Sequence, residues 1–157
     1  MKIRTDFVTN SSSSSFIVGF KDEDSIESQL KKEAIALPRL DTILNDVKKN
    51  RISKAEAIHL FEEEMFWVAL WYLEDKYERK FIHSDENLND WLENHENREE
   101  FYQKVLEKRN LWLNKFKDTI KGLDYIALLN YDDHCNDDLE QRIMPKLDCT
   151  IQRFSHH

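Results

Sequence analysis

Glycine, proline and cysteine are scarce in this chain of 157 residues, which has only 2 of each. The phosphate-binding loops of nucleotide-binding folds need several glycines within a few positions, whereas Gly19 and Gly122 lie far apart in the sequence. A Rossmann fold and a P-loop are therefore excluded. Because tight turns also depend on glycine and proline, the composition predicts a helix-rich fold with few hairpins.

Long apolar runs are missing as well. No window contains the roughly 18 apolar residues of a transmembrane helix, and the N-terminus lacks the apolar core of a signal peptide. Cys135 and Cys149 do not make a disulfide framework. We therefore expect a cytoplasmic protein in a reducing compartment, without membrane contact.

Positive charge is in deficit, since the net charge is −8. An acidic chain is repelled by nucleic acids and anionic membranes, so general binding to either is disfavoured. The 4 Trp, 5 Tyr and 9 Phe argue against disorder, because disordered chains are poor in aromatic residues. The chain is long enough to bury a core of its own, and we expect one domain over residues 1–157.

Strand patterns lie at both ends of the sequence and helical patterns lie between them. This order predicts an α+β fold, mostly helical, with a small, mainly antiparallel sheet formed by N-terminal and C-terminal strands. The segment 1–20 carries the N-terminal strand and the Ser run, and the helical body covers 23–121. The predicted strands are 16–20, 124–131 and 149–155, and the short segment 3–8 is compatible with a β conformation. The predicted helices are about 25–36, 40–47, 53–79, 84–95, 97–121 and 137–143.

The strongest helical pattern begins at a capping box, Ser53-Lys54-Ala55-Glu56. Its centre, Met65–Leu73, is apolar on every face of the helix. A helix that is apolar all round is usually buried. We therefore predict that this segment is the buried hub of the domain.

An unbroken run of five serines separates two short apolar segments at the N-terminus. Serine hydroxyls bond readily to neighbouring backbone groups, which favours a structural or recognition role for the run. A nucleophilic serine would need a base and an oxyanion hole, and nothing nearby in the sequence supplies them. The candidate binding residues are Asn10, Ser11, Ser12, Ser13, Ser14 and Ser15.

The stretch that contains this run, Lys2-Ile-Arg-Thr-Asp-Phe-Val-Thr-Asn-Ser-Ser-Ser-Ser-Ser-Phe-Ile17, resembles a signature that opens a range of small bacterial and phage proteins of uncharacterised activity. The bodies that follow the signature differ widely. The resemblance implies a bacterial or phage-related origin and assigns no catalytic residue. A shared N-terminus on unlike bodies also implies a factor that recognises the N-terminal segment.

A second candidate site lies in the C-terminal part of the chain, where histidine and acidic residues gather. Zinc prefers imidazole and thiolate ligands, and the candidate metal ligands are His134, His156, His157, Asp132 and Cys135. Their spacing matches no established zinc motif, and an antiparallel pairing of the two C-terminal strands would separate His134 from His156. The alternative to a zinc site is that these residues lie in a solvated loop and an exposed tail, with no cofactor.

Three further patterns are more typical of a solvated surface than of a site. His59 and Glu63 stand one helical turn apart and could form an acid–base pair. The acidic loop around Asp132 and Asp137 lacks the central glycine of a calcium-binding EF-hand. The helix 97–121 interleaves lysines with Trp112 and Phe116, as nucleic-acid-binding helices do, but acidic neighbours dilute its charge.

Taken together, these patterns favour a non-enzymatic module that binds a partner protein. A zinc-dependent enzyme built on the C-terminal His, Asp and Cys residues is the first alternative. Nucleic-acid binding through the helix 97–121 is the second.

Overall fold

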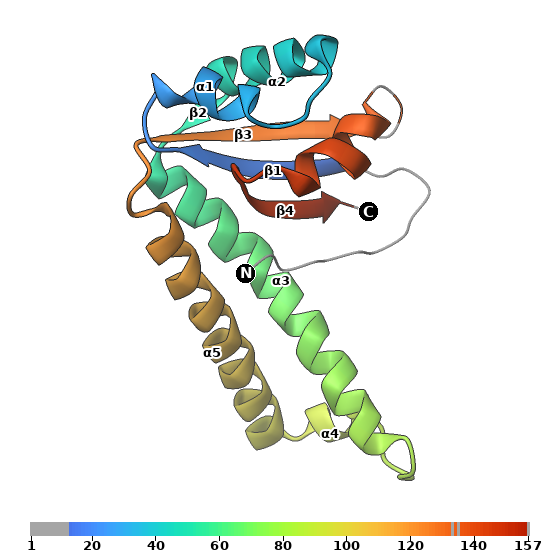
Figure 1. Cartoon of the computed structure of the whole chain (residues 1–157). Coiled ribbons are helices and arrows are strands. Elements are labelled where there is room, and N and C mark those ends of the chain that lie inside the picture. The colour runs from blue at the N-terminus through green and yellow to red at the C-terminus, as the bar shows by residue number, and fades with distance from the viewer. Residues whose placement is uncertain (1–12, 133, 135, 157) are drawn as a thin grey trace. The chain divides into compact units, whose positions relative to one another are not determined.

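A computed structural model describes residues 13–132, 134 and 136–156 (Figure 1). The fold is α+β, as predicted, with most described residues in helices and one antiparallel sheet of four strands. The strands are β1 (Ser13–Phe20), β2 (Arg51–Ile52), β3 (Tyr125–Asp132) and β4 (Thr150–His156). The helices are α1 (Ser25–Lys31), α2 (Leu37–Lys49), α3 (Lys54–Phe81), α4 (Leu88–Glu93), α5 (His95–Ile120), the π-helix η1 (Asp138–Ile143) and the 3₁₀-helix η2 (Met144–Lys146).

The chain divides into two compact units, whose boundaries fall inside α3 and α5. The first unit, which holds the sheet, comprises Met1–Ala57 and Thr119–His157, and the second, helical unit comprises Ile58–Asp118. The expectation of one domain stays a prediction.

The first strand of the sheet lies between the two C-terminal strands. The strand order is β2-β3-β1-β4, and β1 pairs antiparallel with both β3 and β4. Because β3 and β4 both run opposite to β1, they end at the same end of the sheet, where Ser13 is paired with Asp132 on one side and with His156 on the other. The predicted sheet of N-terminal and C-terminal strands is confirmed. β3 and β4 do not pair with each other, because β1 lies between them, so the direct antiparallel pairing that would separate His134 from His156 does not occur.

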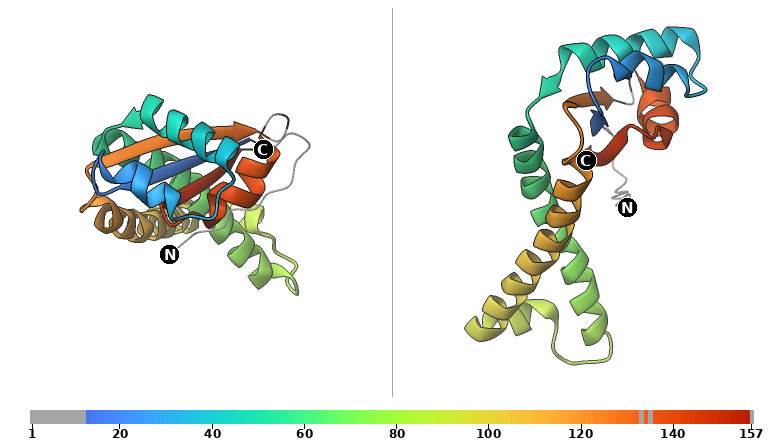
Figure 2. Two further views of the ribbon diagram at one scale, coloured as in Figure 1. Left: turned by 45° about the horizontal axis from the view of Figure 1, so that its top comes forward. Right: turned by 60° about the vertical axis from the view of Figure 1, so that its left-hand side comes forward.

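One face of the sheet carries the main core of this unit. Alternate residues of β1, such as Phe16 and Val18, point to this face, and α1 and α2 cover it (Figures 1 and 2). Ile26 of α1 and Ile43 of α2 are fully buried against these residues. Leu139 of η1 belongs to the same cluster, so the π-helix packs on the helix-covered face as well.

The helical unit is an antiparallel pair, α3 and α5, connected through α4 (Figure 1). Phe61 of α3 stacks on Phe116 of α5 with their ring centroids 4.2 Å apart. Tyr77 of α3 meets Phe101 of α5 edge to face at 5.3 Å, and Trp91 of α4 also contacts Tyr77, at 5.1 Å. Aromatic pairs of this kind hold the two helices together. No helix in the described part of the chain is both long enough and apolar enough to cross a bilayer.

The predicted buried hub on α3 is wrong in part. Met65, Ala69 and Leu73 are buried, but Trp67 keeps 53% of its surface exposed and Trp71 keeps 47%. A helix in a two-helix hairpin has one neighbouring helix and buries one face against it. The apolar residues on its other face therefore stay on the surface.

Candidate functional site

The described part of the predicted serine site, Ser13 to Ser15, divides between the two faces of β1, since successive side chains of a strand point to opposite faces. Ser14 is fully buried, whereas Ser13 is exposed and Ser15 is partly exposed. The Ser15 hydroxyl donates a hydrogen bond of 2.6 Å to Oδ1 of Asn130 on β3. Asn10, Ser11 and Ser12 lie outside the described residues. The described serines, Ser13 to Ser15, thus belong to a strand and do not form a uniform surface of hydroxyls.

Ser14 belongs to a buried polar network that joins β1, η1 and β4. Its hydroxyl donates to Oε1 of Glu140 at 2.7 Å and accepts from both Nε and Nη2 of Arg153 at 3.1 Å. Nη2 of Arg153 lies 3.6 Å from Oε1 of Glu140, which has no exposed surface, and the guanidinium group lies 5.7 Å from the centroid of the Phe16 ring. A buried charge persists when it is paired and hydrogen-bonded, as it is here.

The network has a structural role, because a substrate cannot reach the Ser14 hydroxyl. A nucleophilic hydroxyl must reach a substrate, and the Ser14 side chain is wholly covered. Glu140 sits in a π-helix, a distortion that is frequent at functional sites. In this protein the distortion places a carboxylate under the first strand, where it fixes η1 to the sheet.

The candidate metal ligands are only partly described. Asp132 and His134 are exposed at the end of β3 and in the turn that follows it, and the backbone of His156 pairs with Ser13. Cys135 and His157 lie outside the described residues. Within the part of the chain that the structure describes, no group of three or more His, Cys, Asp or Glu residues could hold a metal ion. The zinc site stays a prediction.

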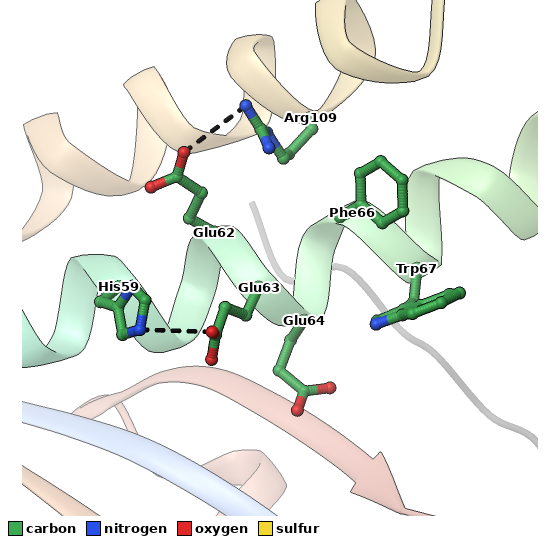
Figure 3. A pocket seen from close by; sticks show the side chains of 7 residues that line it. All are labelled: His59, Glu62, Glu63, Glu64, Phe66, Trp67 and Arg109. Carbon is green, nitrogen blue, oxygen red and sulfur yellow. Dashed lines mark ion pairs between the residues drawn. The ribbon is translucent and has the colours of Figure 1, made fainter. Parts of the chain in front are cut away.

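The described surface of the helical unit has a hollow of about 670 Å³ on α3 (Figure 3). Two ion pairs cross it: Glu62 with Arg109 of α5 at 3.5 Å, and Glu63 with His59 at 3.3 Å. The second pair is the i, i+4 pair anticipated from the sequence, and both of its side chains are well exposed. Among the described residues Glu64 makes no ion pair. The hollow is lined by His59, Glu62, Glu63, Glu64, Phe66, Trp67 and Arg109.

Trp67 connects this hollow to an outward-facing stripe on α3. Residues spaced by three or four positions share one face of a helix, and the spacing 63, 67, 71, 74 and 78 follows that rule. We call these residues the Trp–Glu stripe; they are Glu63, Trp67, Trp71, Glu74 and Glu78. Four of them are exposed and Glu74 is partly buried. Its burial raises the pKa of the Glu74 carboxyl, and the negative charge of Glu78 raises this pKa further.

No family model, curated protein or solved structure matches the chain. The geometry therefore stands alone as a guide to function. Sequence reasoning missed the exposed Trp67 and Trp71, although their spacing of four, with Glu63 before them and Glu74 and Glu78 after them, is a readable signal. It also missed Glu140 and Arg153, for which no local signal exists.

The lysines of α5 are largely used within the helical unit. Lys104 donates hydrogen bonds to Glu100 and to the Tyr77 hydroxyl, and these two bonds raise the pKa of the lysine. Lys108 lies over Tyr72, 4.8 Å from the ring centroid. Trp112 is 8% exposed, so its ring face is not free to stack on a base. These contacts stabilise the helical unit and do not form a surface for binding nucleic acid.

Proposed function

We propose that this protein is a non-enzymatic binding module that docks a partner protein on the Trp–Glu stripe of α3. One observation carries the proposal: two tryptophans, one helical turn apart, each leave about half of their surface exposed, 53% for Trp67 and 47% for Trp71. Tryptophan is the residue most typical of the energetic centre of protein interfaces. An indole ring on the surface gains by burial against a partner, because apolar area leaves water.

The glutamates of the stripe also suit an interface. Interfaces combine an apolar centre with a polar rim, and the two tryptophans are flanked by Glu63 before them and by Glu74 and Glu78 after them. The hollow beside Trp67 adds a concave surface that a partner side chain can enter (Figure 3). A bacterial or phage-related setting, as the N-terminal resemblance implies, is part of this proposal.

The test compares four forms of the full-length protein, each immobilised and exposed to a lysate of the source cells. These forms are the unchanged chain, Trp67→Ala, Trp71→Ala and the control Tyr102→Ala, which removes an aromatic ring of similar exposure from α5. A genuine partner is retained by the unchanged chain and by the control, and its purified form binds either tryptophan variant about 30-fold more weakly or worse, as loss of an interface hot spot costs about 2 kcal/mol.

Circular dichroism of all four forms checks that the helices remain folded. If every protein that is retained by the unchanged chain is retained equally by both tryptophan variants, the stripe is not the docking surface. The proposal then fails.

A second function, a zinc-dependent enzyme, is favoured by one observation. The register of β1 places Asp132 and His156 on either side of Ser13 at one end of the sheet. Strands in a sheet are about 4.8 Å apart, so the two backbones are about 10 Å apart. Metal analysis of untagged protein prepared without chelator tests this function. Less than one metal ion per chain, with no gain in stability on addition of zinc, would remove it.

A further inference from the structure

The helical unit carries most of the net negative charge of the protein. Between Ile58 and Asp118 the sequence has fifteen acidic and nine basic side chains, which gives a net charge of −6 within a total of −8. On α3 the negative charge lies ahead of Lys76, because no lysine or arginine stands between Lys54 and Lys76. The exposed tryptophans therefore lie in the most negative stretch of that helix.

The carboxylates around Trp67 are poorly neutralised by the chain itself. Glu63 is paired with His59, whose charge is positive only when the imidazole is protonated. Glu64, three positions before Trp67, makes no ion pair among the described residues. At the other end of the stripe, Glu74 and Glu78 repel each other, which is the reason why the charge of Glu78 raises the pKa of Glu74.

Other aromatic rings of the helical unit lie next to the ammonium groups of lysine side chains. Lys80 lies 4.2 Å from the ring centroid of Tyr77, and Lys108 lies 4.8 Å from that of Tyr72 and 5.4 Å from that of Trp112. Among the described residues, no lysine or arginine lies over Trp67, whose ring contact is with Phe66. Indole is the strongest of the aromatic acceptors of a cation.

We infer that the partner presents a segment rich in lysine and arginine to the Trp–Glu stripe, an inference that rests on the docking function proposed above. A cationic side chain from the partner covers the Trp67 ring and is held by the carboxylates of Glu63 and Glu64. The tryptophan supplies apolar contact and the acidic rim supplies charge complementarity. Nucleic acids and anionic membranes carry the wrong charge for this surface.

The probes are deca-arginine and deca-glutamate, each carrying a fluorescent label, titrated with the full-length protein while anisotropy is measured. Deca-arginine binds and deca-glutamate does not. Trp67→Ala weakens the binding of deca-arginine about two- to fivefold, which is the worth of one cation–π contact at an exposed site. Raising the salt concentration from 0.1 to 1 M shortens the screening length from about 10 to 3 Å and weakens the binding further.

A matched pair of charge variants separates a specific site from general attraction. Glu63→Gln with Glu64→Gln removes two charges from the stripe and the hollow, and Glu99→Gln with Glu107→Gln removes two from α5. Glu99 is paired with His95 as Glu63 is with His59, so the control also breaks one exposed i, i+4 pair. The first variant binds deca-arginine at least threefold more weakly than the second.

Equal weakening by both charge variants, or no binding of deca-arginine at all, overturns the inference of a basic partner. That failure is distinguishable from failure of the docking function. If a partner is lost by Trp67→Ala and Trp71→Ala and yet binds both charge variants as tightly as it binds the unchanged chain, the docking function stands. Only the inference that the partner is basic is then removed.

Discussion

Ser14→Ala offers the sharpest test of the buried network, because its neighbour Ser15 provides a control of the same residue type on the same strand. The Ser14 hydroxyl bonds a buried carboxylate and a guanidinium group, whereas the Ser15 hydroxyl bonds the Asn130 amide at the surface. A hydrogen bond to a charged group contributes about 1.5–3 kcal/mol, and a neutral one about 0.5–1.5 kcal/mol. We expect Ser14→Ala to lower the free energy of unfolding of the sheet-bearing unit by about 2–3 kcal/mol, and Ser15→Ala by less than about 1 kcal/mol.

The assay must report on the unit that holds the sheet. All four tryptophans lie between Ile58 and Asp118, so tryptophan fluorescence follows only the helical unit. Hydrogen exchange measured by mass spectrometry on peptides from β1 and β4 follows the sheet directly. A loss of 2–3 kcal/mol raises the exchange rate of the most protected amides of β1 by about 30- to 150-fold.

A double-mutant cycle with Glu140→Gln completes the test. Residues in one network couple by about 0.5–3 kcal/mol, so the two substitutions together cost less than the sum of their separate effects. If Ser14→Ala accelerates exchange no more than Ser15→Ala does, the network contributes nothing beyond an ordinary surface hydrogen bond, and its assignment as the anchor of η1 is wrong.

Two further predictions concern pH. Burial and the hydrogen bond to Asp46 raise the pKa of Tyr131 above its ordinary value of about 10. The unfolded chain then loses this proton first, so the stability present below pH 10 falls as pH rises beyond it; in urea titrations followed by circular dichroism, Tyr131→Phe shows a smaller fall, and an equal fall would contradict the assignment. The raised pKa of Glu74 means that its ionisation opposes folding, so Glu74→Gln melts at a higher temperature than the unchanged chain at pH 7 and at the same temperature at pH 3, as monitored by tryptophan fluorescence. A Glu74→Gln chain that melts lower at pH 7 would refute this sign.

The helices of this fold are predictable because their signals are local. The capping box at Ser53 is present as the sequence predicts: Ser53 Oγ accepts from the Glu56 backbone amide, and Glu56 Oε2 accepts from the Ser53 backbone amide. The apolar stripe of 97–121 is likewise buried, as Phe101 and Phe116 show. In each case residues within a few helical turns of one another determine the feature that was predicted.

What the sequence leaves open depends on contacts between distant segments. β2 has only two residues and exists because Arg51 and Ile52 pair with β3. Glu140 is fully buried and accepts a hydrogen bond from Ser14, 126 positions earlier in the chain. The apolar centre of α3 was misread for a related reason: the composition of one helix does not reveal how many neighbouring helices will cover it.

The place of β1 between β3 and β4 sets the order in which the sheet can be made. Ser14 and Arg153 are 139 residues apart, and at about 5–20 residues per second a ribosome needs about 7 to 28 s to connect them. Until β4 has been synthesised, Phe16–Phe20 is an apolar strand without its full set of partners, which is the kind of segment that aggregates. The serines beside it are small and polar and resist such association. Ser14, which bonds Glu140 of η1 in the finished sheet, thus also places a polar side chain next to this apolar segment while the chain is being synthesised.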